Sequence, residues 1–276
     1  MKKRISLLSM TAIISLLVSL SVSAGESLDR IMSNKLLKVA TAASWAPQSF
    51  INDNNKMDGF DVNVAQEIAK RLGVAIEFVT PEWAVITAGR WNGRWDMSVG
   101  SMTPTTDRAK VLSFPAVYYY TPAVLVVHND SKAQTAADLN DKKMGACASC
   151  TFELYLQHDL TIDAEGVPAF TYDITPASIL SLPNAAAVMD DLRLGDGVRL
   201  DGLVDALPAV NGAIKAGYPF KIVGDPLFYE PLAIALEKGD VELDSKISAI
   251  IDEMKADGTL TKLSNKWYAV DYTATK

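Results

Sequence analysis

The chain has 276 residues, a formal net charge of −7 and a hydrophobic content of 49%. This hydrophobic content is too high for an intrinsically disordered chain. The acidic balance, without runs of Lys or Arg, argues against binding to nucleic acid or to an anionic membrane surface. The length suffices for two modest domains or one large one, and the sequence shows no short repeat or low-complexity tract.

The N-terminus has the pattern of a secretory leader. Three basic residues at positions 2–4 precede an apolar run from about Ile5 to Val22, and small residues at 22–24 follow it. A membrane anchor is the alternative, but a span needs about 20 apolar residues, and this run is short and rich in Ser. We therefore expect residues 1–24 to be a signal peptide cleaved after Ala24, and the mature chain to be secreted to the periplasm.

Beyond the leader, predicted strands alternate with amphipathic helices, which indicates parallel α/β sheets. Asn and Asp residues at 52–55 predict the turn of a hairpin, and Gly73 ends a helix that has a single apolar face. The predicted elements in this part are strands at 36–41, 74–79 and 96–100, a hairpin at 50–60, and helices at 61–72 and 83–91.

The middle of the chain repeats this alternation. The predicted elements are strands at 143–146, 169–172, 202–204 and 220–223, helices at 151–158, 184–194 and 211–215, and two closing helices on either side of Gly258. Two extended segments, 123–128 and 222–226, are candidate hinges. They predict a discontinuous lobe one of residues 25–125 and 225–276 and a lobe two of residues 126–224. A small ligand is expected in the cleft between two such lobes.

Five segments carry a family resemblance. They are Gly59–Ala65, Ser101–Ala109, Phe114–Tyr120, Met144–Glu153, and the C-terminal pair Ala256–Leu260 and Lys266–Tyr268. In this order and spacing, the chain resembles the polar-amino-acid family of ABC-transporter solute-binding proteins (solute-binding protein family 3) over nearly all of its mature length. The resemblance implies an α/β fold of the type II periplasmic-binding-protein class, in which each lobe is a mixed sheet flanked by helices and two hinge strands join the lobes.

The resemblance also implies a function. Such a protein captures an amino acid or amino-acid-derived ligand in the interlobe cleft and delivers it to the permease subunits of an ABC importer. It is expected to be a monomer without cofactor or metal, and a second role as partner of a chemoreceptor is compatible with this. The alternative is a periplasmic enzyme on the same fold, of the cyclohexadienyl dehydratase type. That function needs a positioned acid or base in the cleft, for which Asp205 is the strongest acidic candidate.

Four residues are expected at the carboxylate end of the ligand. The resemblance places Arg108 on the family's carboxylate-binding arginine, and a guanidinium can bind a carboxylate through two hydrogen bonds. Ser101 and Thr103 match positions that hold the ligand's head group, with ordinary loop chemistry as the alternative. Thr151 matches a second carboxylate contact, near a predicted helix start in lobe two.

The residues expected around the ligand's side chain and ammonium group match the family pattern less closely. Trp45 and Trp83 match two aromatic residues that flank the ligand, with core packing as the alternative. Many family members carry an acid where this chain has Ala42, and the family's ammonium-binding Asp falls on Ala206, one position after Asp205. Because one position reverses the face of a strand residue, either the loop shifts so that Asp205 contacts the ligand, or the ammonium site is altered.

Cys147 and Cys150 form the one cysteine pair of the sequence, and two residues stand between them. This spacing also occurs in redox motifs and in half of a zinc site. Zinc would need two more ligands, and His128 and His158 do not form a matching pair. In an oxidising compartment, a local disulfide is the simplest interpretation. We expect it to rigidify the turn before Thr151, so that its reduction weakens ligand affinity.

Overall fold

The predicted strands pair into one mixed sheet in the computed structural model, which describes residues 26–274. The expected signal peptide and its cleavage after Ala24 lie outside the described residues. Within residues 26–274, no helix is both long enough and apolar enough to cross a membrane.

The main sheet of the described chain has nine strands in the order β10-β9-β11-β8-β12-β6-β1-β5, with β7 paired to β12. The strands of this sheet are β1 (Leu36–Ala40), β5 (Ala75–Val79), β6 (Met97–Met102), β7 (Leu112–Ser113), β8 (Val117–His128), β9 (Lys143–Cys147), β10 (Ser178–Leu182), β11 (Gly202–Ala206) and β12 (Phe220–Glu237). A small separate sheet contains β2 (Ser44–Trp45), β3 (Ser49–Ile51) and β4 (Met57–Asp58).

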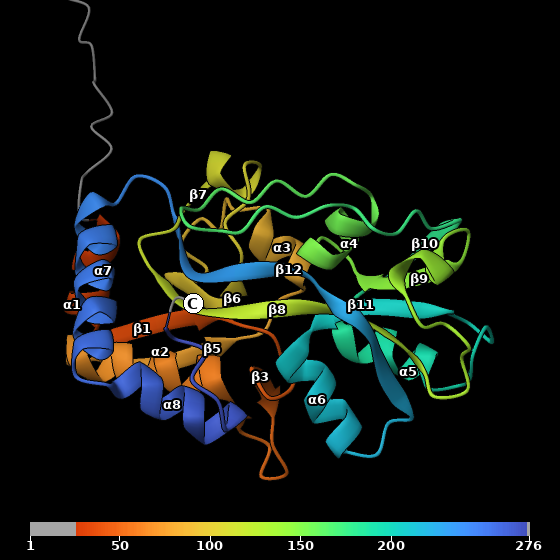
Figure 1. Cartoon of the computed structure of the whole chain (residues 1–276). Helices are drawn as coiled ribbons and strands as arrows, with labels where there is room; N and C mark the ends of the chain where they lie inside the picture. The colour runs from red at the N-terminus through yellow and green to blue at the C-terminus, as the bar shows by residue number, and fades with distance from the viewer. Residues whose placement is uncertain (1–25, 275–276) are drawn as a thin grey trace, which may run out of the picture.

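The long strands β8 and β12 pair antiparallel and cross the middle of the molecule (Figure 1). On one side of them, β1 pairs in parallel with β5 and β6; on the other, β9 pairs in parallel with β10 and β11. The two segments predicted as hinges lie within β8 and β12. The expected lobe boundaries, at 125/126 and 224/225, also fall within these strands, and the exact extents of the lobes stay a prediction.

Helices cover both halves of the sheet. They are α1 (Glu26–Asn34), α2 (Phe60–Leu72), α3 (Trp83–Thr87), α4 (Thr151–Leu156), α5 (Ala185–Leu192), α6 (Leu207–Lys215), α7 (Val241–Ala256) and α8 (Thr259–Tyr268), with short 3-10 helices η1 (Arg108–Lys110) and η2 (Ala136–Leu139). In lobe one, the apolar face of α2 buries Val64 and Ile68 against the core residues of β1, α7 and α8. Gly73 adopts a left-handed conformation and ends α2 as predicted.

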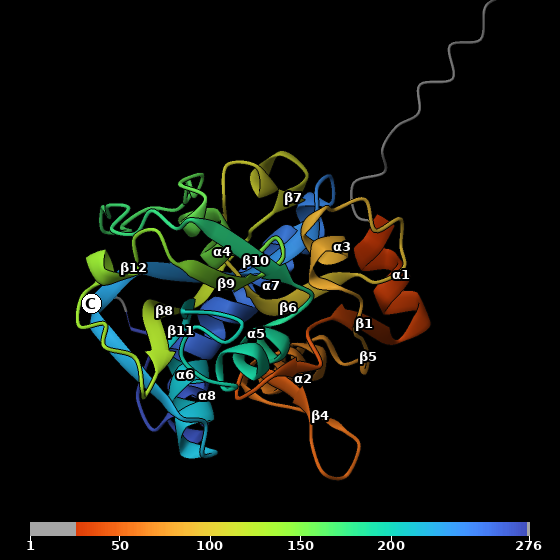
Figure 2. The same ribbon diagram turned by 90° about the vertical axis from the view of Figure 1, so that its right-hand side faces the viewer.

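Lobe two has its own core. Viewed from this lobe, β9, β10 and β11 lie with α4 on one side and with α5 and α6 on the other (Figure 2). The α4 side packs Phe152, Tyr155 and Phe228 together, and the opposite side packs Val188, Leu203 and Val210.

The strand predicted at 169–172 is wrong, because this segment is irregular and the sheet takes its edge strand from β10 instead. Phe170 and Tyr172 produced the strand-like alternation. Their rings pack around Tyr155 at centroid distances of 6.1 and 5.4 Å, and Phe170 also lies 5.5 Å from Phe228. A loop that contributes aromatic side chains to a core therefore has the same residue pattern as a strand.

Candidate ligand-binding site

A cavity lies between the lobes, where the loops after β1 and β6 face the turn between β9 and α4. Its floor includes a residue of β12 that the sequence analysis did not select, Glu230. Six of the seven residues predicted to contact a ligand line this cavity: Trp45, Trp83, Ser101, Thr103, Arg108 and Thr151. Segments from distant parts of the sequence therefore converge here as expected.

Arg108 begins the 3-10 helix η1 and is 6% exposed. Its Nη1 donates to the carbonyl of Thr103 (2.8 Å) and its Nη2 to the carbonyl of Ser149 in lobe two (2.7 Å). Burial lowers the pKa of Arg108 to about 10, and nearby Glu230 opposes this shift, so the guanidinium is charged at neutral pH. These bonds hold a cation at the cavity between the two lobes.

The two predicted aromatic residues have different surroundings. The guanidinium carbon of Arg108 lies 5.7 Å from the ring centroid of Trp83, within the range of a cation–π contact. Trp45 extends from the small sheet of lobe one and packs against both cores of lobe two. Its indole Nε1 donates to Asp205 Oδ1 at 3.2 Å. Trp45 therefore joins the lobes in addition to lining the cavity.

Asp205 is the predicted residue that does not line the cavity. It lies on β11, is 2% exposed, and accepts hydrogen bonds from Trp45 and from the backbone amide of Ala206. Burial raises the pKa of Asp205 to about 7. Its role as a ligand contact stays a prediction, and it would require Asp205 to leave the indole of Trp45.

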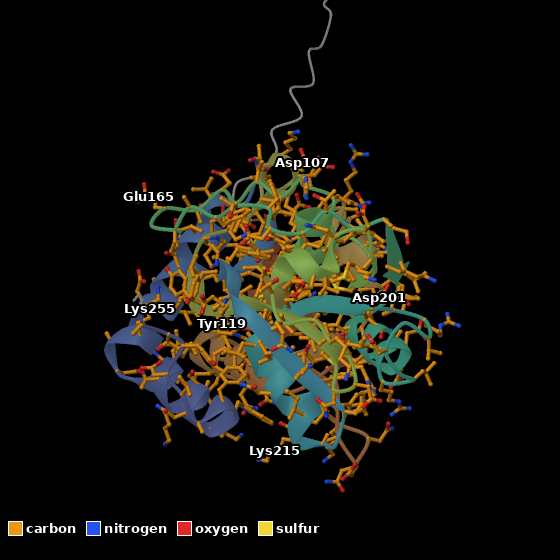
Figure 3. The ribbon with its side chains drawn as sticks, turned by 45° about the vertical axis from the view of Figure 1, so that its right-hand side comes forward. Asp107, Tyr119, Glu165, Asp201, Lys215 and Lys255 are labelled. Carbon is orange, nitrogen blue, oxygen red and sulfur yellow. A yellow bond between two sulfur atoms is a disulfide. The ribbon has the colours of Figure 1, made fainter. Side chains whose placement is uncertain are left out.

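Ser101 lines the cavity, but its hydroxyl points into lobe one. Ser101 Oγ lies 2.9 and 2.7 Å from the two carboxylate oxygens of Asp61, and the hydroxyl of Tyr118 donates to Asp61 at 2.6 Å. Tyr119, labelled in the interior of the molecule in Figure 3, is hydrogen-bonded to the same Ser101 hydroxyl. We call these four residues the inner polar cluster. Asp61 lies in the first turn of α2, two residues after Gly59, which precedes the helix.

Thr103 and Thr151 approach each other from the two lobes. Both hydroxyls donate to Oε1 of Glu230, that of Thr103 at 2.8 Å. Glu230 is 2% exposed, and its Oε2 is buried without a hydrogen-bond partner among the described residues. Burial raises the pKa of Glu230, while the two threonines and Arg108 lower it. The sequence signal that could have found Glu230 is a charged residue within the apolar strand segment 227–236.

The predicted disulfide between Cys147 and Cys150 is present, and both cysteines line the cavity. It closes the turn that carries the Ser149 carbonyl, the lobe-two partner of Arg108. The Ser149 amide in turn donates to Glu153 at 2.6 Å. Within residues 26–274, no group of three or more His, Cys, Asp or Glu side chains is placed to hold a metal ion.

A second contact between the lobes lies beside the cavity. The loop after α4, drawn in green above β12 in Figure 1, extends over to lobe one. There Thr105 forms an isolated antiparallel bridge with Ile162, and backbone hydrogen bonds join Thr106 to Thr161 (3.1 Å) and Asp163 to Pro104 (3.0 Å). The cavity is therefore bounded by lobes that touch each other.

A comparison with known families matches residues 37–270 to the bacterial extracellular solute-binding proteins, family 3. The chain belongs to this family. It is 30% identical over 249 residues to the L-cystine-binding protein TcyJ of Escherichia coli strain K12, covering 89% of this chain and 87% of that protein. It is 29% identical over 258 residues to the L-arginine-binding protein of Pseudomonas aeruginosa, covering 89% and 92% of the two chains.

Among solved structures, the ancestral amino acid-binding protein AncCDT-1, described as a precursor of cyclohexadienyl dehydratase, superposes on this family member with a TM-score of 0.76. The sequence identity is 30%, and the match covers 88% of this chain and 99% of the other. The expected two-lobe fold of the type II periplasmic-binding class is thus confirmed, together with the membership of solute-binding family 3.

Proposed function

We propose that this chain is the periplasmic component of an ABC importer that captures an amino acid or an amino-acid-derived solute and delivers it to the permease subunits. The observation that carries the proposal is the interlobe cavity. Arg108 and Glu230 are the two charged residues among its described lining, and indole and phenyl rings line it as well. A cavity with a few fixed charges and apolar surroundings suits a small zwitterion with an aliphatic or sulfur-containing side chain.

Arg108 is the proposed binding site for the ligand's carboxylate. Its remaining N–H groups can donate to two carboxylate oxygens, and each charge-assisted bond of this kind contributes about 1.5–3 kcal/mol. Ser101, Thr103, Thr151, Trp45, Trp83 and Asp205 are the further proposed contacts. Because they come from both lobes, a ligand held between them would favour the closed arrangement.

The proposal also covers the protein's location, oligomeric state and partners. The pattern at residues 1–24 supports secretion to the periplasm with cleavage after Ala24, and we place the mature protein there as a monomer. Its partners would be the membrane subunits of the importer, and also a chemoreceptor if the ligand is sensed. N-terminal sequencing of the periplasmic fraction and light scattering of the purified protein test these points.

A thermal-shift screen of the mature protein tests the binding function. The panel is L-cystine, L-arginine and the remaining proteinogenic amino acids, because relatives are named for the first two. A ligand at 100 times its Kd adds about 2.7 kcal/mol to the free energy of unfolding, which gives a clear rise in Tm. A flat response to the whole panel and to amino-acid conjugates would overturn the proposal.

A protein with the proposed binding function is not expected to be an enzyme, and the alternative enzyme function can be tested separately. A dehydratase of cyclohexadienyl acids would use an acid in the cleft as proton donor, and Glu230 is the acid that lines the cavity. Incubation with prephenate, followed by product analysis, is expected to show no turnover. Formation of the dehydrated, decarboxylated product by wild type, and its loss in Glu230→Gln, would replace the proposal with the enzyme function.

A further inference from the structure

Glu230 occupies an unusual position for a buried acid. It lies on β12, paired in register with Thr121 of β8, at the junction of the two lobes. One oxygen of its carboxylate, Oε1, accepts hydrogen bonds from Thr103 of lobe one and Thr151 of lobe two. The other oxygen, Oε2, has no partner among the described residues, although it is fully buried and the residue lines the cavity.

An unpaired carboxylate oxygen in such a place is costly. A buried acceptor that lacks its hydrogen bond loses the full solvation of that group, and the loss is larger for a charged group. The Asp61 carboxylate, by contrast, has partners for both of its oxygens. Because Glu230 lines the cavity, a donor that arrives from the cavity can supply the missing hydrogen bond.

The hydrogen bonds of Thr103 and Thr151 limit which ligand groups can bind here. A hydroxyl has one proton to donate, and those of Thr103 and Thr151 are directed to Glu230. In this arrangement Arg108 is the charged donor for a ligand carboxylate, and a hydrogen bond from Thr103 or Thr151 to that group would require the hydroxyl to leave Glu230. The free oxygen of Glu230 remains for a donor group on the ligand.

The two charges of the cavity are also held apart. No nitrogen of Arg108 lies within 4.0 Å of a Glu230 oxygen in the described chain, and Arg108 bonds to the carbonyls of Thr103 and Ser149 instead. An anion and a cation that share a cavity without pairing fit a ligand that carries both charges. Ala42 and Ala206 stand where the family resemblance predicts acids, so Glu230 is the acid available for the ligand's ammonium group.

We propose that Glu230 binds the ammonium group of the ligand through Oε2, and that it makes a cationic nitrogen near the carboxylate a requirement for binding. This inference rests on the proposed binding function and adds the residue that selects the ligand's amino end. It assigns the ammonium group to a residue other than Asp205, which is bonded to Trp45 outside the cavity lining. Asp205 stays a proposed contact for an arrangement in which it leaves that indole.

Calorimetric titration of the mature protein tests the inference. The probe is the tightest-binding amino acid of the panel, compared with its deamino analogue, which keeps the carboxylate and the side chain. Wild type is expected to bind the amino acid about 10- to 100-fold more tightly than the analogue, the contribution of one charge-assisted hydrogen bond. Equal affinities in wild type would overturn the inference without the use of any variant.

Glu230→Gln is the matched substitution, because it keeps an acceptor oxygen for the threonines and replaces the free oxygen with an NH₂ group. It is expected to lower the affinity for the amino acid by about 10- to 100-fold and to leave that for the analogue unchanged. Glu165→Gln, an exposed residue near the margin of Figure 3, should change neither. If Glu230→Gln does not fold, as judged by circular dichroism, Glu230→Asp keeps the charge and should retain the preference for the amino acid.

The outcomes separate the two proposals. If wild type binds no amino acid, the proposed function is overturned. If wild type and Glu230→Gln bind the amino acid with equal affinity, the binding function stands and the role of Glu230 is overturned. If Glu230→Gln loses amino acid and analogue alike while Glu165→Gln binds both, Glu230 supports the shape of the cavity rather than the ammonium site, and the inference is also overturned.

Discussion

Two groups of buried polar residues, the inner polar cluster and the charged residues of the cavity, differ in how their hydrogen bonds are completed. In the inner polar cluster, Asp61 has partners for both oxygens, all of them from lobe one. At the cavity, Glu230 takes partners from both lobes and keeps one oxygen free. Burial raises the pKa of both acids. A buried acid is therefore not by itself a sign of a binding site; an unfilled hydrogen bond on a residue that lines a cavity is the distinguishing feature.

The largest expected effect comes from removing the cation of the cavity. Arg108→Ala should weaken the binding of a carboxylate ligand by about 100-fold or more, because two charge-assisted hydrogen bonds of about 1.5–3 kcal/mol each are lost. Arg108→Lys keeps the charge but cannot form two parallel hydrogen bonds as a guanidinium does. Its ligand affinity should lie between those of wild type and Arg108→Ala. Isothermal titration measures both affinities.

Arg90, which is exposed and outside the cavity lining, supplies the control. Arg90→Ala should bind as wild type does. If a folded Arg108→Ala protein binds carboxylates normally, Arg108 is not part of the binding site. The proposed difference between the charged residues of the cavity and the inner polar cluster would then be wrong.

Local patterns and family motifs predicted much of this molecule. The single apolar face of α2 and its stop at Gly73 are local properties, and the structure has both. Arg108, Thr103 and Thr151 could be selected because each lies in a recognisable segment, and the fold brings these segments to one cavity. Glu230 could not be found in this way. Its partners are 127 and 79 residues away in sequence, and only the pairing of β12 with β8 places it between the lobes.

The same reason explains why the sequence did not predict the directions of two polar side chains. From the sequence, Ser101 and Asp205 are polar residues at strand ends, where ligand contacts are common. In this structure their hydrogen-bond partners are Asp61 and Trp45, which lie 40 and 160 residues away, and their role as ligand contacts stays a prediction. Side-chain direction depends on such distant partners, whereas the position of a strand depends mainly on local pattern.

A second prediction concerns the inner polar cluster. Burial raises the pKa of Asp61 from its ordinary 3.8 to about 7, against the hydrogen bonds from Tyr118 and Ser101. Between these pH values, the folded state keeps a proton that the unfolded state has lost, so this residue makes the fold less stable as the pH rises. Asp61→Asn does not titrate. Its free energy of unfolding relative to wild type should therefore rise by a few kcal/mol between pH 4 and pH 8, at no more than about 1.4 kcal/mol per pH unit.

Urea unfolding at a series of pH values measures this difference. Asp225→Asn, at an exposed position, should show no such trend. The ligand affinity of Asp61→Asn should stay within about threefold of wild type, because Asp61 does not line the cavity. A large loss of affinity at unchanged stability would show that Asp61 contributes to ligand binding through Ser101, its partner in the cavity lining.

The smallest effect is expected from reducing the disulfide. Its cysteines line the cavity, but it is connected to Arg108 through one backbone oxygen. The bond between Cys147 and Cys150 closes the turn whose Ser149 carbonyl accepts from Arg108 across the interlobe gap. Reduction frees this turn, and the loss of part of one interlobe hydrogen bond should weaken ligand affinity by about three- to tenfold. A Cys147→Ser/Cys150→Ser protein should show the lower affinity with or without reductant.

If the effect acts through Arg108, the Arg108→Lys protein should lose less affinity on reduction than wild type does, because its side chain lacks the second N–H donor directed at Ser149. Equal affinity of wild type in oxidising and reducing buffer would mean that the turn keeps its shape without the disulfide.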